Sequence, residues 1–449
     1  MSMPAPARRL VLIVTTLASF LTPFMGSSVT VALPMIGREF GLGPLGLSWV
    51  ATSYLLAAAI LLVPFGKLAD SRGRTRIFIG GMVVYTLASL GCTLAPSAGV
   101  LMASRVGQGL GGAMVFGTSV AILTSAFPPE QRGRVIGINV AAVYLGLSLG
   151  PFLGGILTEQ FGWRSVFAGN VLAGLVTSAA SAWKLPADAR PGSGAPFDWA
   201  GLACYSIGLA AIISGFSRLP GRTGVLLLAA GVAAAAAFVR RERTASDPLL
   251  DLRLFSENRV FAFSNLAALI NYAATYAVAF LLSLYLQNVR GLGAQAAGVL
   301  LVVQPIVQAA VSPFAGRLSD QVPARVLSSA GMAVIAVGLG GLAFIGPAVP
   351  LAAVGGALAA LGVGFGLFSS PNTSAVMGSV PRPQYGVASA TLATVRMTGQ
   401  AFSMGIAMLV FALAGANRGT ASLPAVRMAF GVFAVLSAVG VLASLARDR

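Results

Sequence analysis

Residues 137–155, GINVAAVYLGLSLGPFLGG, form an apolar stretch without any charge, yet five glycines and one proline interrupt it. Glycine and proline are the residues that disfavour a helix most in water. Inside a lipid bilayer the backbone must satisfy its own hydrogen bonds, so a helix forms and these residues are tolerated where neighbouring helices pack closely. The stretch therefore predicts a membrane-spanning helix in tight contact with another helix.

The composition of the whole chain agrees with a lipid environment. Its 449 residues are 57% hydrophobic and only 9% charged, whereas a soluble domain has about 25% charged residues. The net charge of +17 is spread over short basic clusters between apolar runs, which argues against a nucleic-acid surface. The chain has no histidine, and Cys92 and Cys204 lie in apolar segments, so we expect no metal site, no disulfide framework and no cofactor.

About fourteen apolar runs are long enough to cross the hydrocarbon core, which takes about 20 residues per helix. They lie near residues 10–36, 47–66, 77–97, 98–126, 135–158, 165–183, 200–217, 222–239, 259–287, 294–315, 325–345, 349–376, 387–414 and 424–446. The first run continues too far to be a signal peptide, so we interpret it as a transmembrane helix. Basic clusters such as 67–76 and 240–253 fall on one side of the predicted membrane, which places both termini in the cytoplasm.

An internal repeat divides the chain into two related parts. The segment PFGKLAD ends at Asp70 and PFAGRLSD ends at Asp320, and the same offset relates the first and ninth predicted helices. The sequence therefore predicts an all-α integral membrane protein with two six-helix bundles, 1–184 and 259–449. Residues 185–258 form an inserted two-helix hairpin with flanking cytoplasmic linkers. Parallel repeats of this kind favour alternating access at the interface between the two bundles.

Three motifs give the chain a likeness to a known family. GKLADSRGRTR spans residues 66–76, RVGQG spans 105–109, and the stretch 137–155 fits the pattern G-x8-G-x3-G-P-x2-G-G. Over essentially its whole length the sequence resembles the major facilitator superfamily, specifically its fourteen-helix drug:proton antiporter branch. The resemblance implies the major-facilitator fold, with two six-helix bundles plus two inserted helices.

The first two motifs suggest gating and coupling residues. The resemblance implies that Gly66, Asp70 and Arg74, in a loop after the second helix, belong to a cytoplasmic gate, with Asp320 in a degraded copy. It also links Arg105 to proton transfer, with Gln108 one turn away. An arginine within a membrane helix costs about 2.5–3.5 kcal/mol to insert, so it should face the bundle interior. The alternative is that Arg105 binds neighbouring carbonyls and only holds helices together.

The third motif carries a regular glycine stripe. Gly146, Gly150 and Gly154 recur every four residues and share one helix face, beside Pro151 and Gly155. Such a stripe lets another backbone approach closely, and the proline bends the helix. The resemblance implies that the partner is the second helix of the other half, 294–315, and that the contact slides between halves. The alternative is packing without a gating role.

Acidic residues are missing where coupling usually needs them. None of the 12 Asp and Glu residues falls in the middle of a predicted helix, and Glu159, at the outer end of 135–158, comes closest. The family branch often has an Asp where this chain has Met25. A proton-coupled transporter usually needs a titratable group on its pathway, so proton coupling here lacks its usual residue.

The predicted buried charges are Arg105 and Arg396, both positive. Two buried cations without a buried anion favour neutral or anionic amphiphiles over cationic drugs. Further polar residues within the helices are candidates for the substrate or coupling site, although such side chains also form ordinary hydrogen bonds between helices. With the two arginines, the candidates are Gln108, Asn139, Asn265, Tyr272, Tyr276, Gln304, Gln308 and Gln400.

These observations favour a secondary exporter of small amphipathic or hydrophobic compounds, working by alternating access with proton antiport. The alternative is an exporter of one lipid or metabolite, with no ion coupling or a different ion. A receptor, a scaffold and a channel fit less well. We expect no enzymatic activity, and the chain has no phosphate-binding loop for ATP. We expect a monomer in the plasma membrane, with the bilayer, the substrate and protons as partners and no nucleic acid.

Overall fold

The computed structural model describes residues 5–185, 198–216, 218–245, 252–319, 321–381, 385–414 and 422–448. All regular elements in these ranges are helices. Fourteen of the described helical segments are long and apolar enough to cross a membrane. The predicted all-α membrane architecture is therefore confirmed.

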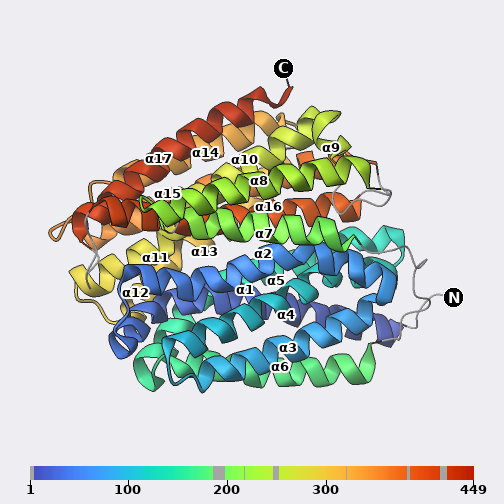
Figure 1. The fold of residues 1–449 in the computed structure, drawn as a ribbon, viewed down its shortest axis with the longest axis horizontal. Helices are drawn as coiled ribbons and strands as arrows, with labels where there is room; N and C mark the ends of the chain where they lie inside the picture. Colours follow the sequence, from blue (N-terminus) through green and yellow to red (C-terminus); the bar gives the residue numbers. More distant parts are fainter. Residues whose placement is uncertain are drawn as a thin grey trace.

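The helices gather into two groups that lie side by side (Figure 1). The N-terminal group contains α1 (Ala5–Phe40), α2 (Pro44–Arg72), α3 (Arg74–Thr93), α4 (Ala98–Ala126), α5 (Pro129–Phe161) and α6 (Arg164–Lys184). The C-terminal group contains α10 (Arg259–Thr275), α11 (Ala277–Leu284), η1 (Tyr285–Val289), α12 (Ala294–Leu301), α13 (Val303–Leu318), α14 (Ala324–Leu342), α15 (Leu351–Gly378), α16 (Tyr385–Leu413), α17 (Leu423–Leu445) and η3 (Ala446–Asp448). We call the boundary between these groups the seam.

Two predicted helices of the C-terminal group are broken. The run 259–287 is divided into α10, α11 and the π-helix η1, and the run 294–315 is divided into α12 and α13 at Val302. Pro305 explains the second break, because it has no N–H for the carbonyl of Leu301. In transporters, discontinuous helices are typical of the region that binds the substrate.

The inserted hairpin consists of α7 (Trp199–Phe216) and α8 (Arg222–Thr244), followed by the short α9 (Arg253–Ser256). Helix α7 contacts one helix of each group. The Tyr205 hydroxyl donates to the Ala59 carbonyl of α2 at 3.0 Å. The ring of Phe216 packs against Phe402 of α16, with 5.7 Å between ring centroids. The hairpin therefore covers one side of the seam.

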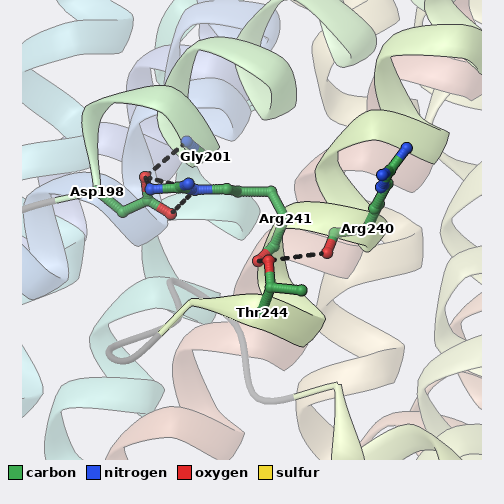
Figure 2. Close-up of polar contacts among 5 residues, drawn as sticks. All are labelled: Asp198, Gly201, Arg240, Arg241 and Thr244. Carbon is green, nitrogen blue, oxygen red and sulfur yellow. Dashed lines mark hydrogen bonds and ion pairs between the residues drawn. The ribbon is translucent and has the colours of Figure 1, made fainter.

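Asp198 caps the first turn of α7 and connects it to α8. Its Oδ1 accepts the backbone N–H of Gly201 at 2.9 Å and lies 3.3 Å from Nη2 of Arg241 (Figure 2). Burial opposes the ionised form of Asp198, but the Gly201 N–H and the Arg241 guanidinium outweigh it. The pKa of Asp198 is therefore lower than its ordinary value of 3.8.

Substituting Asp198→Ala should destabilise the hairpin by about 1 kcal/mol at neutral pH, because the variant loses the helix cap. Since the pKa is lowered in the fold, the stabilisation is present above 3.8 and is lost as the pH falls through the folded-state value. Thermal unfolding of the purified protein should therefore show a difference in melting temperature that shrinks below this pH. Thr244→Val is the control, since Thr244 binds only carbonyls of its own helix. A difference independent of pH would contradict the assignment.

Candidate functional site

A direct hydrogen bond joins the two groups between α5 and α15. The hydroxyl of Tyr144, halfway along α5, lies 2.7 Å from Oγ of Ser369 on α15. Ser369 is buried. This contact places polar atoms of both groups at one point of the seam.

Arg396 of α16 belongs to the same region. Its Nη2 donates to Oγ1 of Thr373 at 2.7 Å, and Thr373 lies one turn from Ser369 on α15. Its guanidinium lies over the ring of Tyr272, 5.6 Å from the centroid. Tyr272 in turn contacts Phe365 edge to face, at 5.3 Å. We call Tyr144, Tyr272, Ser369, Thr373 and Arg396 the seam cluster.

The seam cluster combines residues that the sequence predicted with residues that it missed. Arg396 and Tyr272 were candidates, whereas Tyr144, Ser369 and Thr373 were not. The one available signal was spacing, because Ser369 and Thr373 lie four residues apart on one face of a helix interrupted by Pro371. Their contact with α5 is visible only in three dimensions.

Arg105 lies in a network inside the N-terminal group. It is 1% exposed. Its Nε donates to the Val50 carbonyl at 3.1 Å and its Nη1 donates to Gln108 Oε1 at 2.8 Å. Gln108 and Asn170 both donate to Ser89 Oγ, at 2.8 and 2.9 Å. This geometry favours the structural alternative for Arg105 and Gln108.

The Arg105 network extends to α2. The guanidinium lies 4.7 Å from the ring centroid of Tyr54 on that helix. The candidate Tyr276 lies at the junction of α10 and α11 in the other group. The positive charge of Arg105 therefore has an aromatic neighbour within its own group.

Several candidates lie outside the seam cluster. Asn139 donates to Thr15 and Ser19 of α1, and Asn265 donates to the carbonyl of Phe261 one turn back. Asn139 therefore joins α5 to α1 within its own group, as the alternative interpretation predicted, whereas the bond of Asn265 stays within α10. The other glutamine candidates are the half-buried Gln304 and Gln400 and the buried Gln308. No hydrogen bond among the described residues connects any of these three side chains to the seam cluster.

The glycine stripe of α5 faces α1 of its own group. A Cβ added to Gly146 would lie 2.5 Å from the Phe20 carbonyl oxygen, and one added to Gly154 would lie 2.7 Å from Cβ of Ser28. Gly150 meets Ser27 and Phe24 in the same way. The prediction that this stripe contacts 294–315 is therefore wrong for these three glycines.

Two hydroxyl groups of α1 explain why the glycine stripe of α5 packs against this helix. Ser27 Oγ donates to the Gly146 carbonyl at 3.4 Å, and Ser28 Oγ donates to the Gly150 carbonyl at 2.9 Å. These bonds need the two backbones to lie close together, which only side-chain-free positions permit. The stripe thus builds a tight pair of helices within one group.

Gly155 and Pro151 do make the predicted contact with the other group. A Cβ on Gly155 would lie 2.7 Å from the Ala294 carbonyl oxygen, and a Cβ on Gly298 would collide with the Pro151 carbonyl. Beside them, Glu159 Oε2 accepts the backbone N–H of Gln295 at 2.7 Å. We call this interface between the end of α5 and the start of α12 the end contact.

A second hydrogen bond closes the same end of the seam. Gln287 Nε2 of η1 donates to the Val31 carbonyl of α1 at 3.0 Å. Glu159 thus caps a helix of the opposite group, where the positive end of the helix dipole favours a carboxylate. The two groups are therefore held together at the end where α5 finishes and α12 begins.

The residues predicted for the gate at the opposite end lie differently from the expectation. Helix α2 continues to Arg72, and the turn is made by Gly73 with φ +106°, so most of 66–76 is helical and not a loop. Gly66 instead lies against α4, because a Cβ on Gly117 would be 3.2 Å from its backbone nitrogen. Arg74 starts α3. The Asp70 side chain and Asp320 lie outside the described residues, so the gate role stays a prediction.

Two groups of membrane-length helices around a polar seam define a membrane transporter, not an enzyme. The sequence model of the Major Facilitator Superfamily matches residues 15–404. The chain belongs to this family and is a multi-pass membrane protein that carries a small molecule.

Characterised relatives cover most of the chain. It is 31% identical over 401 residues to the riboflavin transporter RibZ of Clostridioides difficile, covering 89% of this chain and 86% of the relative. It is 34% identical to the multidrug resistance protein Stp of Mycobacterium tuberculosis, covering 90% and 76%. It is 35% identical to the cephamycin export protein CmcT of Amycolatopsis lactamdurans, covering 92% and 86%.

Solved structures share the fold. A bacterial homologue of the human lysosomal transporter Spinster, in an inward-facing and unoccupied conformation, matches with a TM-score of 0.69 and 20% identity, covering 99% of this chain and 98% of that one. The human organic anion transporter MFSD10 matches with a TM-score of 0.66 and 16% identity, covering 98% of this chain and 100% of that one. At these identities the likeness concerns the fold alone.

Proposed function

We propose that this chain exports small amphipathic compounds from the cytoplasm in exchange for protons. Residues 1–184 and 259–449 move as two halves around the seam, and the protein works as a monomer in the plasma membrane with both termini inside. The observation that carries the proposal is the seam cluster, in which Tyr144 of one half meets Ser369 of the other between two membrane-length helices.

The two ends of the seam fit alternating access. In the proposed orientation the end contact lies on the external side, so the structure corresponds to a state closed to the outside. A substrate bound midway would then exchange with the cytoplasm until the end contact opens. The names of Stp and CmcT, a multidrug resistance protein and an export protein, support export over uptake.

We infer that the charge of Glu159 helps to hold the end contact closed. A carboxylate beside the first turn of α12 is favoured by the positive end of the helix dipole, so loss of this charge weakens the contact. Other charged groups have partners of their own: Glu39 pairs with Arg164 at 2.7 Å, and Arg290 donates to the carbonyl of Val349. Removing the charge of Glu159 therefore favours the outward-open state.

The variant Glu159→Gln should weaken the end contact at neutral pH by about 0.5–1 kcal/mol, because the amide keeps the shape but loses the charge. A single cysteine at Gln295, in a background without Cys92 and Cys204, reports opening through its labelling by an impermeant maleimide. The variant should label faster than the protein that keeps Glu159. Glu39→Gln is the matched control. Equal labelling rates with and without the charge of Glu159 would refute this role.

Transport itself is tested in inside-out vesicles with an imposed pH gradient and a panel of cationic, neutral and anionic dyes. We expect dye accumulation that depends on the gradient and stops when a protonophore is added. Accumulation that ignores the gradient would reject proton antiport. Accumulation driven by ATP without any gradient would reject a secondary transporter altogether.

A second candidate is a transporter of one specific metabolite, without proton coupling. It is favoured by the charge of the seam cluster, which among the described residues contains a guanidinium but no carboxylate. The name of RibZ shows that a relative is assigned to a single vitamin. In the vesicle assay this candidate predicts narrow selectivity and no response to the gradient.

A further inference from the structure

Arg396 differs from Arg164 and Arg241, at the edges of the seam, in what it pairs with. Arg164 is paired with Glu39, and Arg241 is paired with Asp198. Among the described residues Arg396 has a hydroxyl partner, Thr373, and the ring of Tyr272, but no carboxylate. A guanidinium inside a membrane protein is costly unless an anion or several acceptors compensate it.

The donors of this arginine are not fully used. Its Nε is buried and has no hydrogen-bond acceptor within the described structure. The hydroxyls of Tyr144 and Ser369, which share a hydrogen bond of 2.7 Å, lie in the same cluster. The seam cluster therefore combines O–H and N–H donors with a positive charge at one place, and Nε of Arg396 lacks an acceptor among the described residues.

The chemistry that fits such a set is a carboxylate. A guanidinium binds a planar carboxylate through two parallel N–H bonds, which a single neutral acceptor cannot reproduce. The edge-to-face rings of Tyr272 and Phe365 lie beside the cation and suit an aromatic body attached to the anionic group.

We propose that the seam cluster is a site for amphipathic organic acids, with the carboxylate on Arg396 and the ring against Tyr272. The inference rests on the proposed function and names the substrate class of that same site. The carboxylate supplies the acceptor that Nε lacks, and it competes for the proton that Tyr144 and Ser369 share. Because this pair joins the two halves, an acid bound there acts on the contact that separates during transport. A cationic amphiphile is repelled at this point.

The test is direct binding to the purified full chain in lipid nanodiscs, measured by equilibrium dialysis with three probes of one shape. These are naphthylacetate, naphthylacetamide and naphthylethylammonium. We expect the acid to bind most tightly and the cation most weakly. Arg396→Gln should weaken binding of the acid by about tenfold, as the loss of one charge-assisted contact implies, and should change binding of the amide less than twofold.

Two further variants keep the test decisive. Thr373→Val removes the hydroxyl that positions Nη2, so it should lower acid affinity several-fold without removing the charge. Arg427→Gln is the control, because Arg427 of α17 donates to the carbonyl of Ile345, just after α14, and has no contact with the seam cluster among the described hydrogen bonds. Equal affinity of the unmodified chain for the three probes overturns the proposal, and this comparison does not depend on how well a variant folds. An equal loss of all three in a folded Arg396→Gln variant overturns it as well. Selective binding of the acid without any vesicle transport would instead overturn the proposed function and leave the site intact.

Discussion

Replacing Gly155 by leucine is expected to lower transport by about tenfold or more while the protein still reaches the membrane in normal amount. A side chain at this position would press on the backbone of α12, since a Cβ alone would lie 2.7 Å from the Ala294 carbonyl oxygen. The end contact could then no longer close. A shift of about 1.4 kcal/mol in the balance between the two states already gives a tenfold change.

Two other glycines of the chain are matched controls for this prediction. Gly150→Leu should reduce the amount of folded protein, because Gly150 packs against Ser27 within one group. Gly169→Leu should have little effect, because nothing lies within 4 Å of its added Cβ. Dye transport per unit of protein in vesicles separates the two kinds of loss. Normal transport by a well-folded Gly155→Leu variant would show that the end contact does not need to close.

Replacing Arg105 by leucine is expected to destabilise the N-terminal group by about 2 kcal/mol, because buried acceptors lose their donor. Gln108 Oε1 and the Val50 carbonyl both receive hydrogen bonds from Arg105, and Gln108 continues the network to Ser89. The melting temperature of the purified protein should therefore fall, and so should its level in the membrane.

The double variant Arg105→Leu/Gln108→Leu separates structure from coupling. If Arg105 mainly holds the network, removing its partner as well should cost little more than the single change, because the two residues act as a unit. Arg105→Lys should also be less stable, since an ammonium lacks the fork that reaches both acceptors. A normal melting temperature together with lost transport in Arg105→Leu would instead support the proton-transfer role that the family resemblance implies.

The transmembrane architecture could be predicted from the sequence because lipid leaves the backbone few options. Long apolar runs must become helices in a bilayer, so their number and approximate limits follow from hydropathy. The breaks at Tyr276 and Val302 could not be predicted in this way. They leave the apolar run intact, and Pro305 alone does not distinguish a break from a bend.

The glycine stripe shows a different limit of sequence reasoning. Its spacing indicates that some backbone approaches α5 closely, but it does not say which one. The helix that contacts the stripe is α1, because the hydroxyls of Ser27 and Ser28 bind the carbonyls of α5. The neighbouring Gly155 faces the other group instead. Two adjacent glycines of one motif thus serve two different interfaces.

Two members of the seam cluster, Arg396 and Tyr272, could be predicted from the sequence. A charged residue such as Arg396 is costly to insert in a membrane helix, and Tyr272 is a large side chain with a polar group. Ser369 and Thr373 do not stand out, because most hydroxyls in such helices bind their own backbone, as Thr118 does with the Met114 carbonyl. Tyr144 lies among the glycines of the motif, and its partner is 225 positions away in the chain.

The central claim is that the two halves separate at the end contact during transport. It is tested most directly by the distance between spin labels on Gln160 of α5 and Ala296 of α12, in a background without Cys92 and Cys204. We predict two distance populations in nanodiscs, a short one that matches this structure and a longer one that grows in Glu159→Gln. A single short distance under conditions in which the labelled protein still transports would contradict the account.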